Sequence, residues 1–153
     1  TLNIPNQEAS KIIKSFKERY IGIERFMKET LDFAREHGYV ETLLHRRRNL
    51  EDINHPNRNI REFNERAAIN SPLQGSASDL IKLAMINIQN WIEKEKLPID
   101  ILMQVHDELV FELPKAELEQ WVPEITRQME KVVKLKVPLR VDVHSGENWM
   151  EAK

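Results

Sequence analysis

Apolar side chains recur at every third or fourth position over two stretches near the start of the chain. The first stretch follows Pro5 and ends at about Tyr20, and the second runs from Ile23 to a stop at Gly38. This spacing places the apolar side chains on one face of a helix. Pro suits a first helical turn, and Gly suits the position after the last turn. The pattern therefore predicts two successive helices, each with one apolar face.

After Gly38 the apolar positions alternate instead. Residues compatible with a β-strand occupy alternate positions at Val40, Thr42 and Leu44, and a basic segment follows as far as Leu50. A period of two is typical of strands, so residues 39–50 are predicted to form a short hairpin. Residues 52–59 contain Asn-His-Pro-Asn, whose composition is typical of a loop.

A helical period resumes near Arg61 and meets Ser71-Pro72-Leu73-Gln74. Ser can cap a helix, Pro can be its first residue and Gln can complete a capping box, so we expect the helix to break or kink there. Beyond this point the apolar positions from Leu80 to Ile92 fall on one face, which predicts a helix buried on one side. Pro98 should end it.

Two apolar runs, at residues 99–105 and 109–113, are separated only by His106, Asp107 and Glu108. So short a separation predicts a tight antiparallel hairpin. Pro114 should open another helix that Pro123 kinks or divides.

Residues 137–143 are predicted to form a last strand. Helices mixed with antiparallel strands indicate an α+β fold, in which several helices pack with a sheet made of the second hairpin and the last strand. We expect residues 1–97 to be mainly helical with a short basic hairpin. Residues 98–153 should contain the second hairpin, a helix and the last strand.

Length and composition agree with a folded domain. The chain has 153 residues, of which 41% are hydrophobic and 31% charged, a balance that a disordered chain would not show. No apolar run approaches the roughly 18 residues of a membrane span, so no membrane partner is predicted. The first residues do not show the basic start and apolar stretch of a secretory leader. The absence of cysteine excludes disulfide scaffolds, thiolate zinc sites and cysteine nucleophiles.

The net charge of −2 does not indicate a polyanionic partner, but the local distribution of charge does separate two regions. Arginines concentrate between His45 and Arg66, whereas acidic residues predominate between Asp107 and Glu130. The first region could meet phosphates and the second could hold cations.

Adjacent carboxylates at Asp107 and Glu108 are the first candidate for chemistry. Because like charges repel, such a pair between apolar strands favours relief by a hard cation, and Mg²⁺ prefers carboxylate ligands. Two alternatives stay open. An exposed turn can simply prefer polar residues, or His106 could act as the base of a small metal hydrolase, although no second ligand cluster such as His-x-x-x-His is present.

Arg66, Asn70 and Gln74 are spaced four apart and would form one polar stripe on a continuous helix. Their chemistry suits phosphate, sugar and base-edge contacts. The four small residues that follow, at 75–78, would let another backbone approach closely, and the alternative is a capped helix start packed against a neighbour. The run Arg46, Arg47 and Arg48 could meet a phosphate backbone or be a solvated face.

Together these segments resemble the carboxyl-terminal part of the family A DNA polymerases, the bacterial DNA polymerase I type. The resemblance covers essentially the whole chain and is carried by four segments, in order: Gly38-Tyr39-Val40-Glu41-Thr42-Leu43 with Arg46-Arg47-Arg48, Glu65-Arg66-Ala67-Ala68-Ile69-Asn70 with Pro72-Leu73-Gln74-Gly75, Gln104-Val105-His106-Asp107-Glu108-Leu109-Val110, and Gly146-Glu147-Asn148-Trp149.

The resemblance implies a role for each candidate residue. Asp107 would be a ligand of the catalytic metals with Glu108 as its acidic neighbour, and His106 would approach the primer end. The residues implied to contact the primer–template duplex are Arg66, Asn70 and Gln74, with Arg46, Arg47 and Arg48 near its backbone. The implied reaction is attack of a primer 3′ hydroxyl on the α-phosphate of a deoxynucleoside triphosphate, assisted by two Mg²⁺ ions. The implied location is the bacterial cytoplasm.

Two positions depart from the family pattern. His45 stands where Gly is frequent, and His tolerates a positive φ less well than Gly. Glu51 stands where Pro is usual, which should leave that loop less rigid.

The family's upstream metal-binding Asp strand and its triphosphate-binding helix have no counterpart in the sequence. We therefore expect the end of the fingers and the second half of the palm of a polymerase, weak metal binding and no activity of the isolated chain. Apolar surface exposed by truncation would favour self-association. The alternative function is a non-catalytic module that binds duplex DNA.

Overall fold

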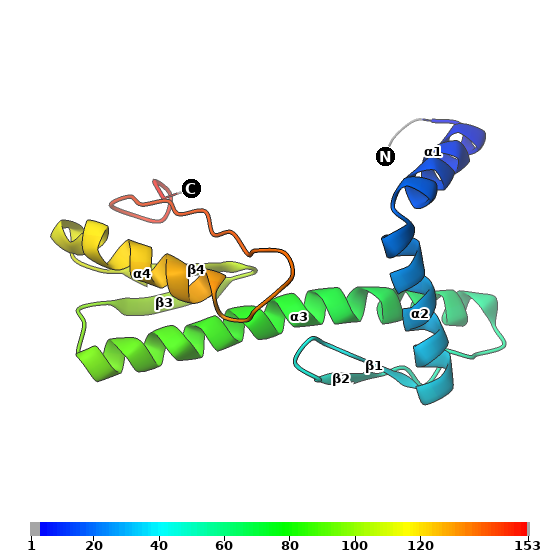
Figure 1. Ribbon diagram of the computed structural model, residues 1–153, viewed down its shortest axis with the longest axis horizontal. Helices are drawn as coiled ribbons and strands as arrows, with labels where there is room; N and C mark the ends of the chain where they lie inside the picture. Colours follow the sequence, from blue (N-terminus) through cyan, green and yellow to red (C-terminus); the bar gives the residue numbers. More distant parts are fainter. Residues whose placement is uncertain (1–3, 153) are drawn as a thin grey trace. The chain divides into compact units, whose positions relative to one another are not determined.

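The computed structural model describes residues 4–152, which form two compact units, one ending at Ser76 and the other beginning at Ala77. The boundary falls inside one long helix. In chain order the elements are α1 (Asn6–Arg19), α2 (Ile21–His37), β1 (Tyr39–Glu41), β2 (Arg47–Asn49), α3 (Arg58–Glu95), β3 (Asp100–Val105), β4 (Glu108–Glu112), the short 3₁₀ helix η1 (Lys115–Glu117) and α4 (Leu118–Glu130) (Figure 1).

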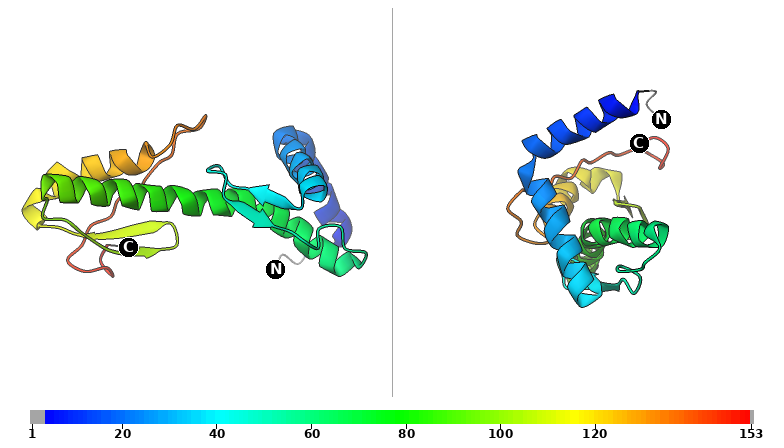
Figure 2. Two further views of the ribbon diagram at one scale, coloured as in Figure 1. Left: turned by 90° about the horizontal axis from the view of Figure 1, so that it is seen from below. Right: turned by 90° about the vertical axis from the view of Figure 1, so that its right-hand side faces the viewer.

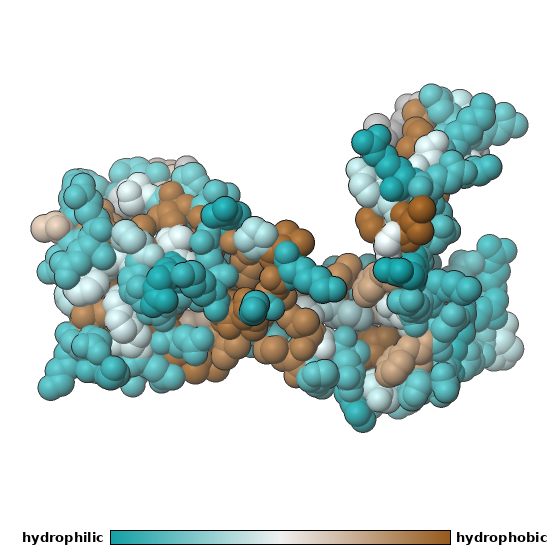
Figure 3. Space-filling model, in the orientation of Figure 1, coloured by the Kyte–Doolittle hydropathy of each residue, from teal (hydrophilic) through white to brown (hydrophobic). Residues whose placement is uncertain are grey.

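The two helices predicted at the start of the chain are confirmed as α1 and α2. Gly38 ends α2 in the left-handed conformation with φ of 75°, and its amide donates to the carbonyl of Ala34 over 2.8 Å. This is the conformation that glycine adopts most readily at a helix end. Apolar side chains at α1 and at the start of α2 stay exposed, for example Ile13 at 57% and Ile21 at 70%, and this surface is brown in Figure 3.

The first predicted hairpin is also confirmed. β1 and β2 pair antiparallel, with Val40 opposite Arg48 and Glu41 opposite Arg47. In the connecting loop, His45 has φ of 62°. The residue that stands where glycine is frequent in the family thus takes a conformation that glycine would adopt more easily.

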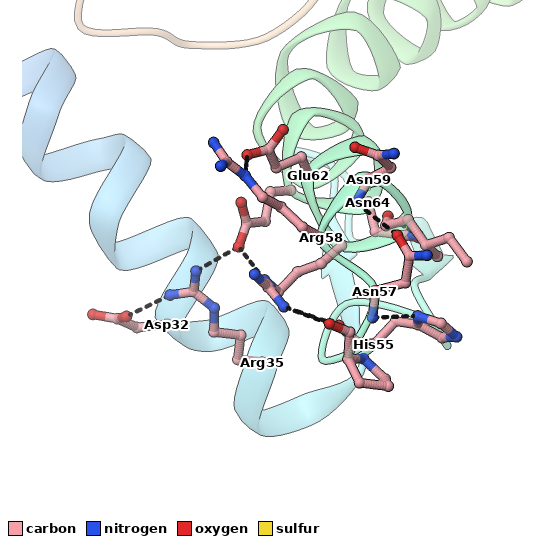
Figure 4. Close-up of polar contacts among 12 residues, drawn as sticks. Asp32, Arg35, His55, Asn57, Arg58, Asn59, Glu62 and Asn64 are labelled. Atoms are coloured by element: carbon pink, nitrogen blue, oxygen red, sulfur yellow. Dashed lines mark hydrogen bonds and ion pairs between the residues drawn. The ribbon is translucent and has the colours of Figure 1, made fainter.

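The core of the first unit lies between α2, the β1–β2 hairpin and the first part of α3. Its buried residues are Ala34, Val40, Leu50, Ile53 and Ala68. Polar contacts beside this core join α2 to α3 and to the preceding loop (Figure 4). Arg35 donates to Glu65 over 2.8 Å, and Arg61 donates to the backbone carbonyl of His55 over 3.1 Å.

The predicted break at Ser71 and Pro72 is wrong, because α3 continues through both residues. Pro72 cannot donate a helical hydrogen bond, but packing on each side of it outweighs that loss. Ser71 is buried and does not cap a helix: its hydroxyl donates to the carbonyl of Ala67 over 2.5 Å, and the hydroxyl of Ser76 donates to the carbonyl of Pro72. Tertiary contacts have therefore overridden a local helix-start signal.

The second unit is built around the later part of α3, as the apolar period predicted. Its core consists of Ile88, Ile92, Ile99 and Ile125, with partly buried side chains of β3, β4 and α4 packed against them. The views in Figure 2 show β3, β4 and α4 along this part of α3. The rings of Trp91 and Trp121 meet edge to face at a centroid distance of 5.8 Å.

The second hairpin is confirmed, and its connection is shorter than the three residues that separate the two apolar runs in the sequence. β3 and β4 pair antiparallel, and Val105 lies opposite Glu108, so only His106 and Asp107 connect the strands. The hairpin is not isolated, because Ile101 of β3 and Phe111 of β4 pack against the buried isoleucines. A hairpin gains independent stability from such a support.

Two expectations for the carboxyl-terminal part are wrong: a division of the helix at Pro123, and a strand at residues 137–143. α4 is a single helix through Pro123, because Glu119 and Pro123 are both exposed and water can satisfy the carbonyl that lacks its helical donor. Residues 137–143 form no strand. Pro138 offers no amide, and no segment among residues 4–152 pairs with this stretch, so its alternating residues form no ladder.

The described part of the chain is thus a mixture of helices and two separate two-stranded antiparallel sheets, in agreement with the predicted α+β class. Among residues 4–152, no helix combines the length and the apolar character that crossing a membrane requires.

Candidate nucleic-acid interface and metal site

The predicted polar stripe exists because α3 does not break. Arg66, Asn70 and Gln74 are all exposed and lie at successive intervals of four residues on one uninterrupted helix. Residues four apart lie above one another on the same helix face. Because the predicted break is absent, the three side chains stay on one helix face. A break at Ser71 would have separated Gln74 from the other two.

A small hollow brings part of this stripe together with part of the basic hairpin. It has a volume of about 100 Å³, and both Arg46 and Arg48 line it together with Gln74. Arg66 and Asn70 do not line it. The structure thus joins two groups that the sequence presented as separate candidates, and it joins them at the end of the stripe nearest the hairpin.

The hairpin reaches α3 at Gly75 and Ser76. A Cβ atom on Gly75 would lie 2.6 Å from Cγ2 of Thr42, which is too close for two carbon atoms that are not bonded to each other. The amide of Leu43 donates to the hydroxyl of Ser76 over 2.7 Å, and Arg46 donates through Nη2 to the carbonyl of Gly75 over 3.2 Å. The small residues therefore let the hairpin approach α3 closely, but the atoms nearest Gly75 belong to the side chains of Thr42 and Arg46 and not to the backbone that the sequence predicted there.

Thr42 and the amide of Leu43 were not predicted to belong to the site. Thr42 is 8% exposed, and its hydroxyl accepts a hydrogen bond from the amide of Arg46 over 3.1 Å. The signal that could have indicated this contact is the run of small residues at 75–78, which requires a partner but does not say which one.

Arg47 has a different environment from the other two arginines of the run. Its Nε donates to Oε1 of Glu41 over 2.8 Å, and its guanidinium carbon lies 4.3 Å from the centre of the Tyr39 ring. The hydrogen bond from Arg47, followed by one from His45, lowers the pKa of Glu41 below its ordinary value. The same contact raises the pKa of Arg47, so both partners stay charged at neutral pH.

The acidic candidates lie in the second unit. His106 and Asp107 form the connection between β3 and β4, Glu108 is the first residue of β4, and all three are exposed. His106 has φ of 54°, and its carbonyl accepts a hydrogen bond from the side chain of Gln104 over 2.9 Å. The sequence correctly placed Asp107 in the connection between the strands. It placed Glu108 there as well, whereas Glu108 begins β4, and it did not identify Gln104 as a support of the connection.

The acidic turn suits a hard cation through its donor chemistry. Two exposed carboxylates offer oxygen ligands of the kind that Mg²⁺ takes, usually with waters and with phosphates of the substrate. No group of three or more potential metal-binding side chains occurs among residues 4–152. Asp107 and Glu108 can therefore supply part of a metal site, and the described residues do not contain the ligand cluster that a metal hydrolase centred on His106 would need.

Comparison with known proteins gives one consistent result. The family model for DNA polymerase family A matches residues 1–151. The DNA polymerase I of Bacillus caldotenax is 47% identical over 152 residues, and that of Geobacillus stearothermophilus is 45% identical over the same length. Each alignment covers 99% of this chain and 17% of the relative, so the chain spans about a sixth of these curated proteins.

A solved structure is similar over nearly the whole chain. It is the POL domain of Pol1 from M. smegmatis in complex with DNA primer-template and dNTP. The TM-score is 0.93 at 40% sequence identity, and the match covers 97% of this chain and 26% of that one.

Proposed function

Because the chain belongs to DNA polymerase family A, we propose that it carries the acidic turn and the duplex-contacting helix of a template-directed DNA polymerase. The observation that supports this most directly is the display of Asp107 and Glu108 at an exposed two-residue hairpin connection. The proposed partners are a primer–template duplex and deoxynucleoside triphosphates, and the proposed location is the bacterial cytoplasm.

In the proposed reaction, a primer 3′ hydroxyl attacks the α-phosphate of a deoxynucleoside triphosphate and pyrophosphate leaves. Asp107 and Glu108 would hold Mg²⁺ through carboxylate oxygens, and His106 would lie beside the primer end. Bound Mg²⁺ supplies the Lewis acidity that activates the attacking oxygen and stabilises the leaving group. Both carboxylates suit this role because they are exposed and offer oxygen ligands.

The polar stripe would contact the duplex. Arg66 offers a charge for a phosphate, and Asn70 and Gln74 offer amides for sugar or base edges. The β1–β2 hairpin would lie near the backbone of the same duplex.

Duplex binding is tested by fluorescence anisotropy of a labelled primer–template over a series of salt concentrations. We expect the affinity to fall steeply with salt, and Arg66→Ala to reduce the slope of log affinity against log salt by about 1. The matched control is Arg25→Ala, an exposed arginine of α2 outside the stripe. Salt-independent binding, or equal effects of the two variants, would contradict the proposed contact.

Metal binding is tested separately with Mn²⁺, which broadens NMR signals of nearby nuclei. We expect weak binding that broadens the amide signals around residues 104–110 and that is lost in Asp107→Asn. The control variant is Asp100→Asn, which removes an exposed carboxylate at the other end of β3. Broadening that is unchanged in Asp107→Asn would argue against a metal site at the turn.

The isolated chain is proposed to be inactive as a polymerase. The described residues gather no cluster of three metal-binding side chains, and incomplete coordination lowers both charge and geometric control. Primer extension with Mg²⁺ and all four nucleotides should therefore yield no product. Clear template-directed extension would contradict this part of the proposal.

The alternative proposal is a non-catalytic module that binds duplex DNA. It is favoured by the first unit, where the stripe and the hollow are both present among the described residues. It predicts the same salt dependence as the polymerase but no Mn²⁺ effect at Asp107, so the NMR experiment separates the two.

The expected self-association stays a prediction, and a monodisperse monomer in light scattering would contradict it.

A further inference from the structure

The three consecutive arginines of the basic hairpin do not have equivalent surroundings. Arg47 lies opposite Glu41 in the register of the strands and is bound to it over 2.8 Å, with its guanidinium above the Tyr39 ring. Its hydrogen-bonding edge and its charge are therefore already engaged within the hairpin. A phosphate would have to compete with a carboxylate that the hairpin itself provides.

Arg48 lies on the other face of β2. It is opposite Val40, it lines the hollow beside Gln74, and its side chain has no hydrogen-bond or ion-pair partner among residues 4–152. Its side chain is exposed. A guanidinium without an internal acceptor, next to an exposed amide, has the donors that a phosphodiester oxygen needs.

Arg46 connects the hairpin to the helix. Its Nη2 donates to the carbonyl of Gly75, and its amide donates to the hydroxyl of Thr42. Because a Cβ on Gly75 would meet Thr42 Cγ2 at 2.6 Å, a side chain at position 75 would force Thr42 or the hairpin to move as long as Thr42 keeps this methyl group. Gly75 and Arg46 thus control where Arg48 lies relative to Gln74.

From these contacts we infer a division of roles along the run. Arg48 is the phosphate-binding arginine of the hairpin, Arg46 and Gly75 are positioning residues that set it beside Gln74, and Arg47 stabilises the hairpin without contacting DNA. This inference rests on the proposed function, since the phosphate is that of the bound duplex.

The first test compares Arg48→Ala with Arg47→Ala in the anisotropy experiment. We expect Arg48→Ala to reduce the salt slope by about 1 and to weaken binding several-fold, because one phosphate contact is lost. Arg47→Ala combined with Glu41→Gln, which leaves no unpaired carboxylate, should keep the slope of the unmodified chain. Equal losses, or a larger loss from the Arg47 variant, would overturn the division of roles.

The second test addresses positioning. Gly75→Ala should displace the hairpin and weaken duplex binding as much as Arg48→Ala does, while helix content is kept because Ala favours helix more than Gly. Thr42→Ser removes Cγ2 but keeps the hydroxyl, so Gly75→Ala with Thr42→Ser should recover the affinity. Gly75→Ala should add no further loss to Arg48→Ala, whereas independent effects would add.

Loss of binding that Thr42→Ser does not restore would overturn the positioning role. The comparison of Arg47 with Arg48 does not depend on how the Gly75 variants fold. If the unmodified chain shows no salt-dependent binding, or if Arg66→Ala binds like it, the proposed function fails together with this inference. If Arg66→Ala weakens binding but the Arg47 and Arg48 variants behave alike, only the inference fails.

Discussion

The two hairpins of this chain are supported by different interactions. The β1–β2 hairpin contributes Val40 to a buried apolar core, and it is also joined to α3 by hydrogen bonds from Arg46 and Leu43, while much of its remaining surface is charged. The β3–β4 hairpin rests on buried isoleucines, with Ile101 and Phe111 packed against them. Both hairpins nevertheless place a histidine in the left-handed region, His45 at φ of 62° and His106 at φ of 54°.

This difference explains which charges are available to a ligand. In the β3–β4 hairpin, the exposed side chains of Asp107 and Glu108 have no hydrogen-bond or ion-pair partner among residues 4–152, which agrees with the proposed metal-binding role. In the β1–β2 hairpin, polar contacts add to the apolar packing of Val40, and the side chains of Arg46 and Arg47 are engaged within the protein. A charged hairpin is therefore a poor guide to binding until its internal contacts are known.

The largest expected effect on stability comes from the isoleucine core against which the β3–β4 hairpin packs. Ile88 is 0% exposed, and Ile88→Ala should lower the free energy of unfolding by about 3 kcal/mol because it removes buried methyl groups and leaves a cavity. Urea denaturation followed by tryptophan fluorescence measures this, since Trp91 and Trp121 adjoin the same core. Asn90→Ala, an exposed change on the same helix, is the control. A loss below about 1 kcal/mol for Ile88→Ala would contradict the dominance of this core.

A smaller effect is expected where the basic hairpin meets α3. Ser76→Ala removes the acceptor of the Leu43 amide and should cost about 1 kcal/mol. Hydrogen exchange measures it directly, because the Leu43 amide should exchange about fivefold faster, the equivalent of that energy. Ser76→Thr keeps the hydroxyl and should exchange more slowly than Ser76→Ala. Unchanged exchange in Ser76→Ala would show that this contact does not hold the hairpin.

Replacing each left-handed histidine by glycine should have a still smaller effect. His106→Gly relieves an unfavourable φ but gives the unfolded chain more freedom, so a net stabilisation of about 0.5 kcal/mol is expected. His45→Gly should gain less, because His45 also lies 3.3 Å from a carboxylate oxygen of Glu41. Thermal unfolding of the two variants measures this order, and a larger gain from His45→Gly would reverse the comparison.

The smallest effect on stability is expected when the pH is lowered. The Arg47 hydrogen bond, followed by the His45 hydrogen bond, lowers the pKa of Glu41 below its ordinary value of 4.5. A group whose folded pKa is lowered stabilises the fold above its unfolded pKa and loses this contribution as the pH falls through the folded pKa. The protection factors of the hairpin amides, in which the pH dependence of the intrinsic exchange rate is removed, should therefore fall below about pH 4.5, and less so in Glu41→Gln. Identical acid profiles would exclude this pair as a stabilising contact.

Most of the elements were predictable from the sequence because their signals are local. The apolar period before Ile92 and the glycine stop at Gly38 depend on residues within one turn or one strand, and the structure confirms both elements. Predictions failed where a distant contact decided the outcome. Packing around Ala68 and Ser71 carried α3 through Pro72, and residues 137–143 lacked a partner strand among the described residues.

The sequence by itself determined the chemical groups and their spacing: a polar stripe at intervals of four residues, adjacent carboxylates between apolar runs, and a basic hairpin. Only the tertiary structure decided which of these groups meet. The hollow lined by Arg48 and Gln74 lies where the side chains of Thr42 and Arg46 approach Gly75 of α3, and the engagement of Arg47 requires Glu41 directly across the strands. Hydrogen bonds and steric contacts act over a few ångströms, so the contacts between segments distant in sequence are set by the fold and cannot be derived from local spacing.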